Sequence, residues 1–267
     1  MPIVRSILRQ VLGYLCSQLP FKLVMKMVKV LLESQGFGSG ARVATSGEIE
    51  AAHSFLYKCA FKNPVVFDVG ANRGEFCEGI LSKFPKSQIY AFEPSTLISE
   101  ALKEHFTAIK QVSVCNYGLG NKTQEMSLFK ESAHARISSL TKLDVTDDQF
   151  TEKVNIRRLD EVVLQLDVDV IHLLKIDVEG HELDVIRGAD RMIVSGRVKI
   201  IQFELGGSSI DTHTTFKDIY DYLTDCKFTI YLIQRRGTQE ITSYNYMYEQ
   251  YSTTNFLAVH RNTKIEY

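Results

Sequence analysis

A short apolar run followed by a glycine turn constrains the fold of this chain most. Residues 65–69 read Val-Val-Phe-Asp-Val, and the next five read Gly-Ala-Asn-Arg-Gly. The apolar run predicts a strand buried on both faces, and Gly70 and Gly74 let the backbone turn closely around a ligand before a helix begins. Residues 89–93, Ile-Tyr-Ala-Phe-Glu, predict a second strand that ends in a carboxylate.

The spacing of this carboxylate indicates a cofactor that contains adenosine. Glu93 follows Gly70 by 23 residues (93 − 70), close to the roughly 20-residue offset at which an acidic side chain binds ribose hydroxyls. A pyrophosphate-binding turn usually has three glycines, whereas this turn has two and carries Asn72 between them. We therefore expect S-adenosylmethionine, whose sulfonium cation suits a nearby carboxylate such as Asp68.

The composition permits one large enzyme domain. The chain has 267 residues, of which 45% are hydrophobic, so it can bury one large core. The 31 basic and 32 acidic residues give a formal net charge of −1, and we expect no binding of nucleic acid. The five cysteines are scattered and never spaced as C-x-x-C, which favours neither disulfides nor a zinc cluster and suits a reducing cytoplasm.

The first 35 residues are more basic than the rest, with five Lys and Arg residues against one Glu. Apolar residues recur at helical spacing in two stretches that Pro20 separates. We predict a basic amphipathic helical extension over residues 1–40, joined by a glycine-rich junction to an enzyme domain over residues 41–267. The helices either pack on the core or on a second copy of the chain, or adsorb to an anionic membrane at its inner, cytoplasmic face. No apolar run reaches the ~18 residues of a membrane span, and no secretory cleavage site is evident.

From residue 65 onward, strand and helix patterns alternate. This rhythm predicts an α/β fold with a mostly parallel sheet, helices on both faces and ligands at the carboxyl ends of the strands. Two late apolar stretches, 228–233 and 256–260, predict a hairpin that closes the sheet edge. The predicted strands and helices are as follows: strands near 65–69, 88–92, 111–115, 169–178, 198–205, 228–233 and 256–260, and helices near 48–60, 74–83, 95–106, 181–193 and 214–226.

The long polar segment 122–159 interrupts this alternation. We interpret it as a loop that follows the third strand and closes over an acceptor substrate at the cofactor end of the sheet. Its candidate substrate-binding residues are His134, Arg136 and Ser138. Arg136 is the best anchor among them for an anionic or polyhydroxyl group.

A second group of chemically active residues ends the fourth long predicted strand, where residues 173–182 read Leu-Leu-Lys-Ile-Asp-Val-Glu-Gly-His-Glu. Side chains alternate along a strand, so Lys175, Asp177 and Glu179 share one face. Burying such groups costs free energy unless they pair or contact a ligand, which favours a site. Glu204 lies at the end of the next strand, at the same predicted edge. We expect the carboxylates of Asp177, Glu179 and Glu204 to converge there.

Six motifs, taken in order, resemble the FkbM-type family of S-adenosylmethionine-dependent methyltransferases. The resemblance covers roughly residues 63–207. It departs from the family at Gly118, where members commonly have alanine. The motifs are Asp68-Val-Gly-Ala-Asn-Arg-Gly74, Phe92-Glu93-Pro94, Asn116-Tyr-Gly-Leu-Gly120, Ser138-Ser139-Leu140, Arg158-Leu159-Asp160 and Lys175-Ile-Asp-Val-Glu-Gly-His-Glu182.

The resemblance implies a seven-stranded Rossmann-like class I methyltransferase fold. It implies that Gly70 and Asn72 lie beside the amino acid part of the cofactor, that Glu93 with Pro94 holds the ribose, and that the region of Asn116 flanks the adenine. Family members transfer the methyl group to hydroxyls of sugars, glycans and related metabolites. The resemblance therefore implies an O-methyltransferase with a small-molecule or glycan acceptor.

Methyl transfer to an alcohol needs collinear positioning of the reacting atoms and is helped by a group that accepts the hydroxyl proton, by about 10²- to 10⁴-fold. Asp177, Glu179 and His181 are the candidate bases, with Lys175 beside them. Alternatively, a divalent cation such as Mg²⁺ bridges Asp177 and Glu204 and lowers the pKa of the hydroxyl. The residue pattern leaves both routes open.

Two other classes of protein remain as alternatives. A nicotinamide-dependent oxidoreductase would use the same Gly70 turn and Glu93, but it would ordinarily need a third glycine near Cys77. A non-catalytic scaffold would keep the Rossmann-like fold, bind membranes through its basic helices and tolerate loss of Asp177.

Overall fold

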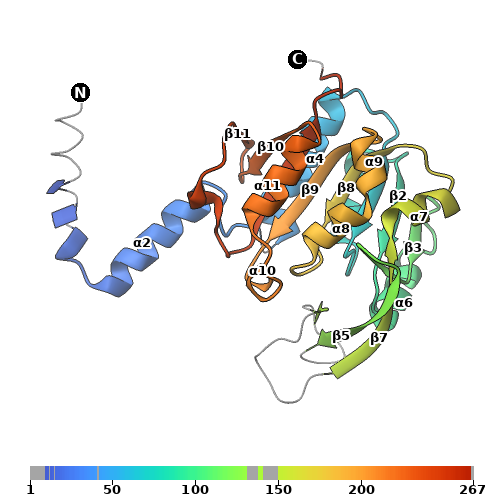
Figure 1. Cartoon of the computed structure of the whole chain (residues 1–267), viewed down its shortest axis with the longest axis horizontal. Helices are drawn as coiled ribbons and strands as arrows, with labels where there is room; N and C mark the ends of the chain where they lie inside the picture. The colour runs from blue at the N-terminus through green and yellow to red at the C-terminus, as the bar shows by residue number, and fades with distance from the viewer. Residues whose placement is uncertain are drawn as a thin grey trace.

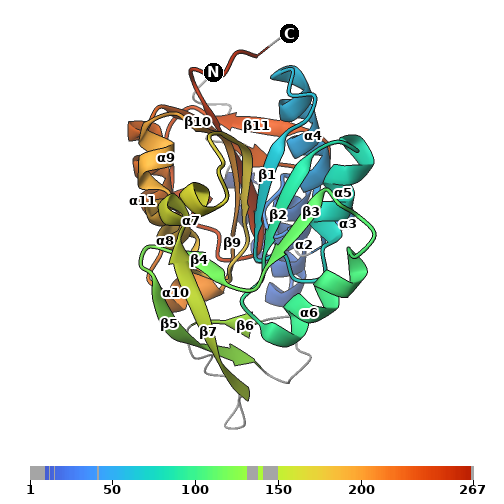
Figure 2. The same ribbon diagram turned by 90° about the vertical axis from the view of Figure 1, so that its right-hand side faces the viewer.

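A mostly parallel sheet of eight strands forms the centre of the protein (Figures 1 and 2). This computed structural model describes residues 10–11, 13–14, 16–40, 42–130, 138–140 and 150–265. The strand order is β11-β10-β12-β9-β8-β1-β2-β3, and β12 runs antiparallel to both of its neighbours. The predicted α/β fold is confirmed, with one edge strand more than the seven expected. The strands are β1 (Val65–Val69), β2 (Gln88–Phe92), β3 (Val112–Cys115), β8 (Ile171–Ile176), β9 (Val198–Leu205), β10 (Phe228–Ile233), β11 (Thr238–Ile241) and β12 (Thr254–His260).

Helices cover both faces of this sheet, as Figure 2 shows. Alternating side chains divide the core in two: Val66 packs beneath α4 and α5, whereas Phe67 packs on the opposite face with α8 and α11. Both faces are therefore apolar, which explains the nearly continuous apolar sequence of the central strands. One face carries α4 (Glu48–Lys58), α5 (Glu75–Lys83) and α6 (Thr96–His105), and the other carries α7 (Leu159–Gln165), α8 (Glu182–Gly188), α9 (Asp190–Val194) and α11 (Phe216–Asp225).

The C-terminal strands pair as the sequence predicted, but they do not form the edge. β10 pairs antiparallel with β12, and β12 lies between β10 and β9. The edge strand is β11, which the polar loop after β10 supplies, and the short helix η1 (Tyr246–Tyr248) follows it. The pattern of β11, with two exposed residues in its centre, is too polar and too short to signal a strand by itself.

The segment 122–159 was predicted to be a loop, and this prediction is wrong for its described parts. They form β5, β6 and β7 of a second sheet, which β4 joins from just before the segment; the order is β4-β7-β5-β6, and β5 and β7 pair antiparallel over seven residue pairs. Side chains alternate between the two faces of these strands, and Leu128 on β5 is buried with Val154 and Ile156 on β7. The strands are β4 (Gly118–Gly120), β5 (Gln124–Lys130), β6 (Ser138–Ser139) and β7 (Phe150–Arg158).

Two helical predictions also change in detail. The predicted helix 181–193 is divided into α8 and α9 around Ala189. Before the core, α2 (Phe21–Ser34) projects away from the sheet in Figure 1, and it contains no buried residue. Packing of the extension on the core is therefore not observed for α2. Among the described helices, none has the length and apolar character needed to cross a membrane.

Candidate functional site

Two adjoining cavities lie at the carboxyl ends of β1, β2, β8 and β9. The larger has a volume of about 660 Å³ and the smaller about 90 Å³. Gly70, Asn72, Asp177 and Glu179 line both of them. These four residues come from the two loops that follow β1 and β8, which are adjacent parallel strands, so the fold brings both loops to one edge of the sheet.

The glycine turn after β1 forms the wall between the cavities. Gly70 has a φ of +82°, and a Cβ there would collide with the carbonyl oxygen of Asp177, so only glycine fits. Gly74 also has a left-handed φ, but a Cβ there would meet the ring of Phe106, and it lines neither cavity. The expected role of Gly74 in cofactor binding thus becomes close packing of the helix that follows.

Glu93 fixes the turn and faces the smaller cavity. Its carboxylate accepts hydrogen bonds from the backbone N–H of Asn72 at 3.1 Å and from that of Ser95 at 2.9 Å. Pro94 lines the same cavity. Asn116 was expected near the adenine, but it is not among the cavity-lining residues; its amide donates to the carbonyls of Glu93 and Pro94, both at 3.1 Å, and so holds this loop.

A buried polar row crosses three neighbouring strands beneath α4. Asp68 on β1 lies beside Lys175 on β8, and Lys175 lies beside Gln202 on β9. All three side chains are almost completely buried. Sequence reasoning placed Asp68 at the cofactor, but it lines neither cavity: Lys175 lies 3.4 Å from its carboxylate, and the Cys77 thiol donates to it at 3.1 Å. Asp68 therefore acts by holding Lys175.

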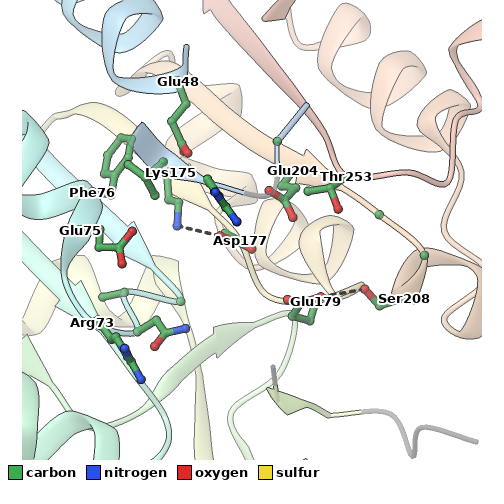
Figure 3. Close-up of a pocket in the computed structure, with 18 of the residues that line it drawn as sticks. Glu48, Arg73, Glu75, Phe76, Lys175, Asp177, Glu179, Glu204, Ser208 and Thr253 are labelled. Atoms are coloured by element: carbon green, nitrogen blue, oxygen red, sulfur yellow. Dashed lines mark hydrogen bonds and ion pairs between the residues drawn. The ribbon is translucent and has the colours of Figure 1, made fainter. Parts of the chain in front are cut away.

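Lys175 lies at the floor of the larger cavity, with its ammonium also 3.2 Å from Asp177 (Figure 3). Burial alone would lower the pKa of this ammonium, but Asp177 and Asp68 outweigh it and raise the pKa above its usual value. The side chain is consequently a fixed cation near neutral pH. It cannot accept a proton there, and its ammonium holds the Asp177 carboxylate.

Glu48, the first residue of α4, is a member of the site that the sequence did not reveal. It lines the larger cavity and is 4% exposed. Its carboxyl accepts hydrogen bonds from the Ser46 hydroxyl at 3.0 Å and from the Gln202 amide at 3.2 Å. Burial raises its pKa from 4.5 to about 7, against the opposing effect of Lys175. A lone glutamate that begins an ordinary helix gives no sequence signal of such a role.

The three acids expected at this edge all line the larger cavity, as Figure 3 shows for Asp177, Glu179 and Glu204. Burial raises the pKa of Glu179 and raises that of Glu204 well above its usual range, and the nearby charge of Asp177 adds to both shifts. Ser208 donates a hydrogen bond to Glu179 at 3.1 Å. Glu179 has a φ of +52°, a strained conformation for a non-glycine residue that is common at functional sites.

The rest of the loop after β8 is structural. Buried Glu182 accepts hydrogen bonds from the backbone N–H groups of Val178 and Gly180, at 3.2 and 3.1 Å, and so shapes the loop that carries Glu179. His181 was a candidate base, but it lines neither cavity, and its ring lies 3.0 Å from the carboxylate of Asp184. It immediately precedes α8, and the contact with Asp184 on that helix holds its ring outside both cavities.

The candidate acceptor residues of the segment 122–159 are only partly among the described residues. His134 and Arg136 lie outside the described residues, and Ser138 is described only as part of β6. Leu128, Leu140 and Ile156 from this sheet line the smaller cavity. The described part of the segment therefore contributes to the wall of the smaller cavity.

Within the described residues, no group of three or more His, Cys, Asp or Glu side chains has an arrangement suited to a metal ion. Asp177, one of the two expected Mg²⁺ ligands, is instead held by Lys175. The magnesium hypothesis receives no support from this geometry.

The sheet order, with β12 inserted antiparallel, together with the glycine turn and Glu93, defines a class I, Rossmann-like methyltransferase fold. A family model described as the methyltransferase FkbM domain matches residues 68–230. The chain belongs to the FkbM methyltransferase family.

Curated relatives are similar to parts of this chain. AmbE, the AMB antimetabolite synthetase of Pseudomonas aeruginosa, is 28% identical over 47% of this chain, and the match spans only 8% of that protein. The 2-O-methyltransferase NoeI of Sinorhizobium fredii is 22% identical over 60% of this chain and 71% of its own length. The hexuronic acid methyltransferase AglP of Haloferax volcanii is 30% identical over 65% of this chain and 67% of its own length.

Proposed function

We propose that this protein transfers a methyl group from S-adenosylmethionine to a hydroxyl group of a sugar, a glycan or a related hydroxylated metabolite. One observation carries the proposal: the two cavities share Gly70, Asn72, Asp177 and Glu179. A ligand whose nucleoside occupies the smaller cavity extends its reactive end past these residues into the larger one. The larger cavity then receives the acceptor.

The residues that line the smaller cavity suit the contacts of a nucleoside. Its apolar walls, which include Leu128, Leu140 and Ile156, suit the faces of an adenine ring. Glu93 lies in the same cavity, and a carboxylate offers about four acceptor positions, enough for ribose hydroxyls beside its backbone partners. Asn72 and Gly70 would then contact the amino acid part.

The charge of the larger cavity favours a cation over a diphosphate. Six acidic and three basic side chains line it. This surplus of carboxyl groups suits a sulfonium better than the pyrophosphate of a nicotinamide cofactor. The acidic residues are Glu48, Glu75, Asp177, Glu179, Glu204 and Asp211, and the basic residues are Arg42, Arg73 and Lys175.

When bound, the cofactor supplies an activated methyl group, and the chain has to orient the acceptor hydroxyl and take its proton. Glu179 is the proposed base, because it lines both cavities and its raised pKa is closer to neutrality than that of an ordinary carboxylate. The Ser208 hydroxyl orients it. Asp177, fixed by Lys175, is proposed to orient the acceptor from the wall that the two cavities share.

The acceptor class rests on the relatives. The names of NoeI and AglP describe a 2-O-methyltransferase and a hexuronic acid methyltransferase. A wide cavity with carboxylates and two arginines, Arg42 and Arg73, suits the many hydrogen-bonding groups of a sugar. We therefore propose a carbohydrate hydroxyl as the acceptor.

Titration calorimetry with S-adenosylmethionine, S-adenosylhomocysteine and NAD⁺ tests the cofactor. We expect the first two to bind and NAD⁺ not to bind. Saturation by NAD⁺ alone would indicate an oxidoreductase, and binding of none of the three would indicate a scaffold. Either result would refute the proposal.

Donor turnover against a panel of monosaccharides, uronic acids and oligosaccharides then tests the acceptor. With the best acceptor, Glu179→Gln should lower turnover by about 10²-fold or more while the affinity for S-adenosylmethionine changes little. Glu204→Gln is the matched control, since it makes the same change in the same cavity and should cost less. Equal losses in both variants would remove Glu179 from the role of base.

A further inference from the structure

α2 is an apolar helix without a partner in the described chain. None of its residues is buried, and Phe21, Val30 and Leu31 are 76%, 58% and 64% exposed. Figure 1 shows the helix projecting away from the sheet. A helix that is apolar over most of its circumference is normally buried, so its exposure within the described structure favours a partner outside that structure.

The charged residues of α2 are confined to one narrow stripe. Lys22, Lys26, Lys29 and Glu33 are spaced by four, three and four residues, which at 3.6 residues per turn places them within an arc of about 60°. Apart from Ser34, all remaining residues of the helix are apolar. Lys29 lies 3.8 Å from Glu33, and the stripe as a whole is basic, with three lysines against one glutamate.

This geometry favours a lipid surface over a second copy of the chain. Contact with one neighbouring helix covers an arc of about 100°, and the rest of the apolar surface would stay in water. The boundary between head groups and acyl chains surrounds a much wider arc, and long lysine side chains reach back to the head groups. Fourteen residues span only about 21 Å, less than the ~30 Å hydrocarbon core, so the helix would lie in the plane of the membrane.

The helix is attached to the core in a fixed manner. The Gln234 amide donates to the Gln35 carbonyl at 3.2 Å, the N–H of Gly38 donates to the Thr254 hydroxyl at 3.1 Å, and the N–H of Gly40 donates to the Thr253 carbonyl at 2.9 Å. These bonds tie the turn after α2 to the ends of β10 and β12. Binding through α2 would therefore orient the whole domain.

We propose that α2 is an interfacial anchor that binds the surface of anionic phospholipid membranes. Its apolar arc inserts between the lipids, and the stripe of Lys22, Lys26 and Lys29 binds their phosphate groups. This inference does not depend on the proposed chemistry.

Co-sedimentation of the full chain with vesicles tests the inference. We expect binding to vesicles of phosphatidylcholine and phosphatidylglycerol that is stronger than binding to phosphatidylcholine alone and that weakens as salt is added. The single variants Lys22→Gln and Lys26→Gln should each bind the anionic vesicles about fivefold more weakly, and their binding to the neutral vesicles should change little.

The apolar arc is tested by combining Phe21→Ser, Val28→Ser and Leu31→Ser, which should abolish vesicle binding while thermal unfolding stays unchanged. The matched control combines Leu164→Ser and Val194→Ser, which replace two exposed apolar residues on the surface of the enzyme domain. This control should bind vesicles as the original chain does. Unchanged binding by the α2 variant would overturn the proposal. A dimer in light scattering that the α2 variant dissociates, without vesicle binding by the original chain, would overturn it in favour of a second copy.

Discussion

Replacing Lys175 with methionine should destabilise the protein strongly. The change keeps the length of the side chain but leaves Asp68, which is fully buried, without the ammonium that lies 3.4 Å from its carboxylate. Breaking a buried ion pair in this way typically costs about 3–5 kcal/mol. For a chain of this size that corresponds to a fall in Tm of about 10 °C. Asp177 contributes less, because its side chain is 34% exposed and water can solvate it.

Denaturant unfolding of four proteins measures this effect: the original chain, Lys175→Met, Asp68→Asn, and the double variant. The double variant should lose less stability than the sum of the single variants, because neither charge is then left unpaired. Lys153→Met is the matched control. It removes an exposed lysine, 3.9 Å from Glu125, and should change stability by less than about 0.5 kcal/mol. A loss below about 1 kcal/mol in Lys175→Met, or simple additivity, would refute the reasoning.

Further predictions concern pH and the glycine turn. The pKa of Glu48 is about 7 in the folded protein, against 4.5 for an ordinary glutamate. Between these pH values the native state binds more protons than the unfolded state, so the free energy of unfolding falls by about 3 kcal/mol as the pH rises through them. Glu48→Gln should flatten this part of the curve of stability against pH. Affinity for S-adenosylmethionine should increase as the pH rises through the raised pKa of Glu204, because this carboxylate then ionises in the cavity that receives the cation, and the neutral S-adenosylhomocysteine should show a smaller change in calorimetry. Gly70→Ala should abolish cofactor binding, since its Cβ would displace the carbonyl of Asp177; equal binding by this variant would contradict the assigned turn.

Several parts of the site could be predicted because their signals are local in the sequence. Gly70 and Gly74 follow an apolar strand, and both have the left-handed φ that a tight turn requires. Glu93 ends the second strand, and parallel pairing of β1 and β2 brings it back to the turn. The periodicity of apolar residues likewise predicted the central strands and most helices of the core.

Other parts could not be predicted, because they depend on contacts between distant segments. Asp68 lies near the end of β1, just before the glycine turn. Its position beside Lys175 on β8 nevertheless places its side chain in the core. Glu48 joins the site only because α4 packs over β9, where Gln202 meets it from 154 positions further along the chain. β5 and β7 stabilise each other across a long insertion, and neither has a strong pattern by itself.

The sequence by itself determined the fold class, the positions of the strands in the cofactor half, and the glycine turn with its acidic partner, since these follow from backbone geometry and hydrophobic periodicity within short segments. Only the tertiary structure decided which polar residues face the cavities and which are buried. It assigned Lys175 and Asp68 to a buried ion pair, brought Glu48 into the site and left α2 exposed. The physical reason is that ionisation and burial depend on neighbours in space, whereas sequence patterns specify neighbours only along the chain.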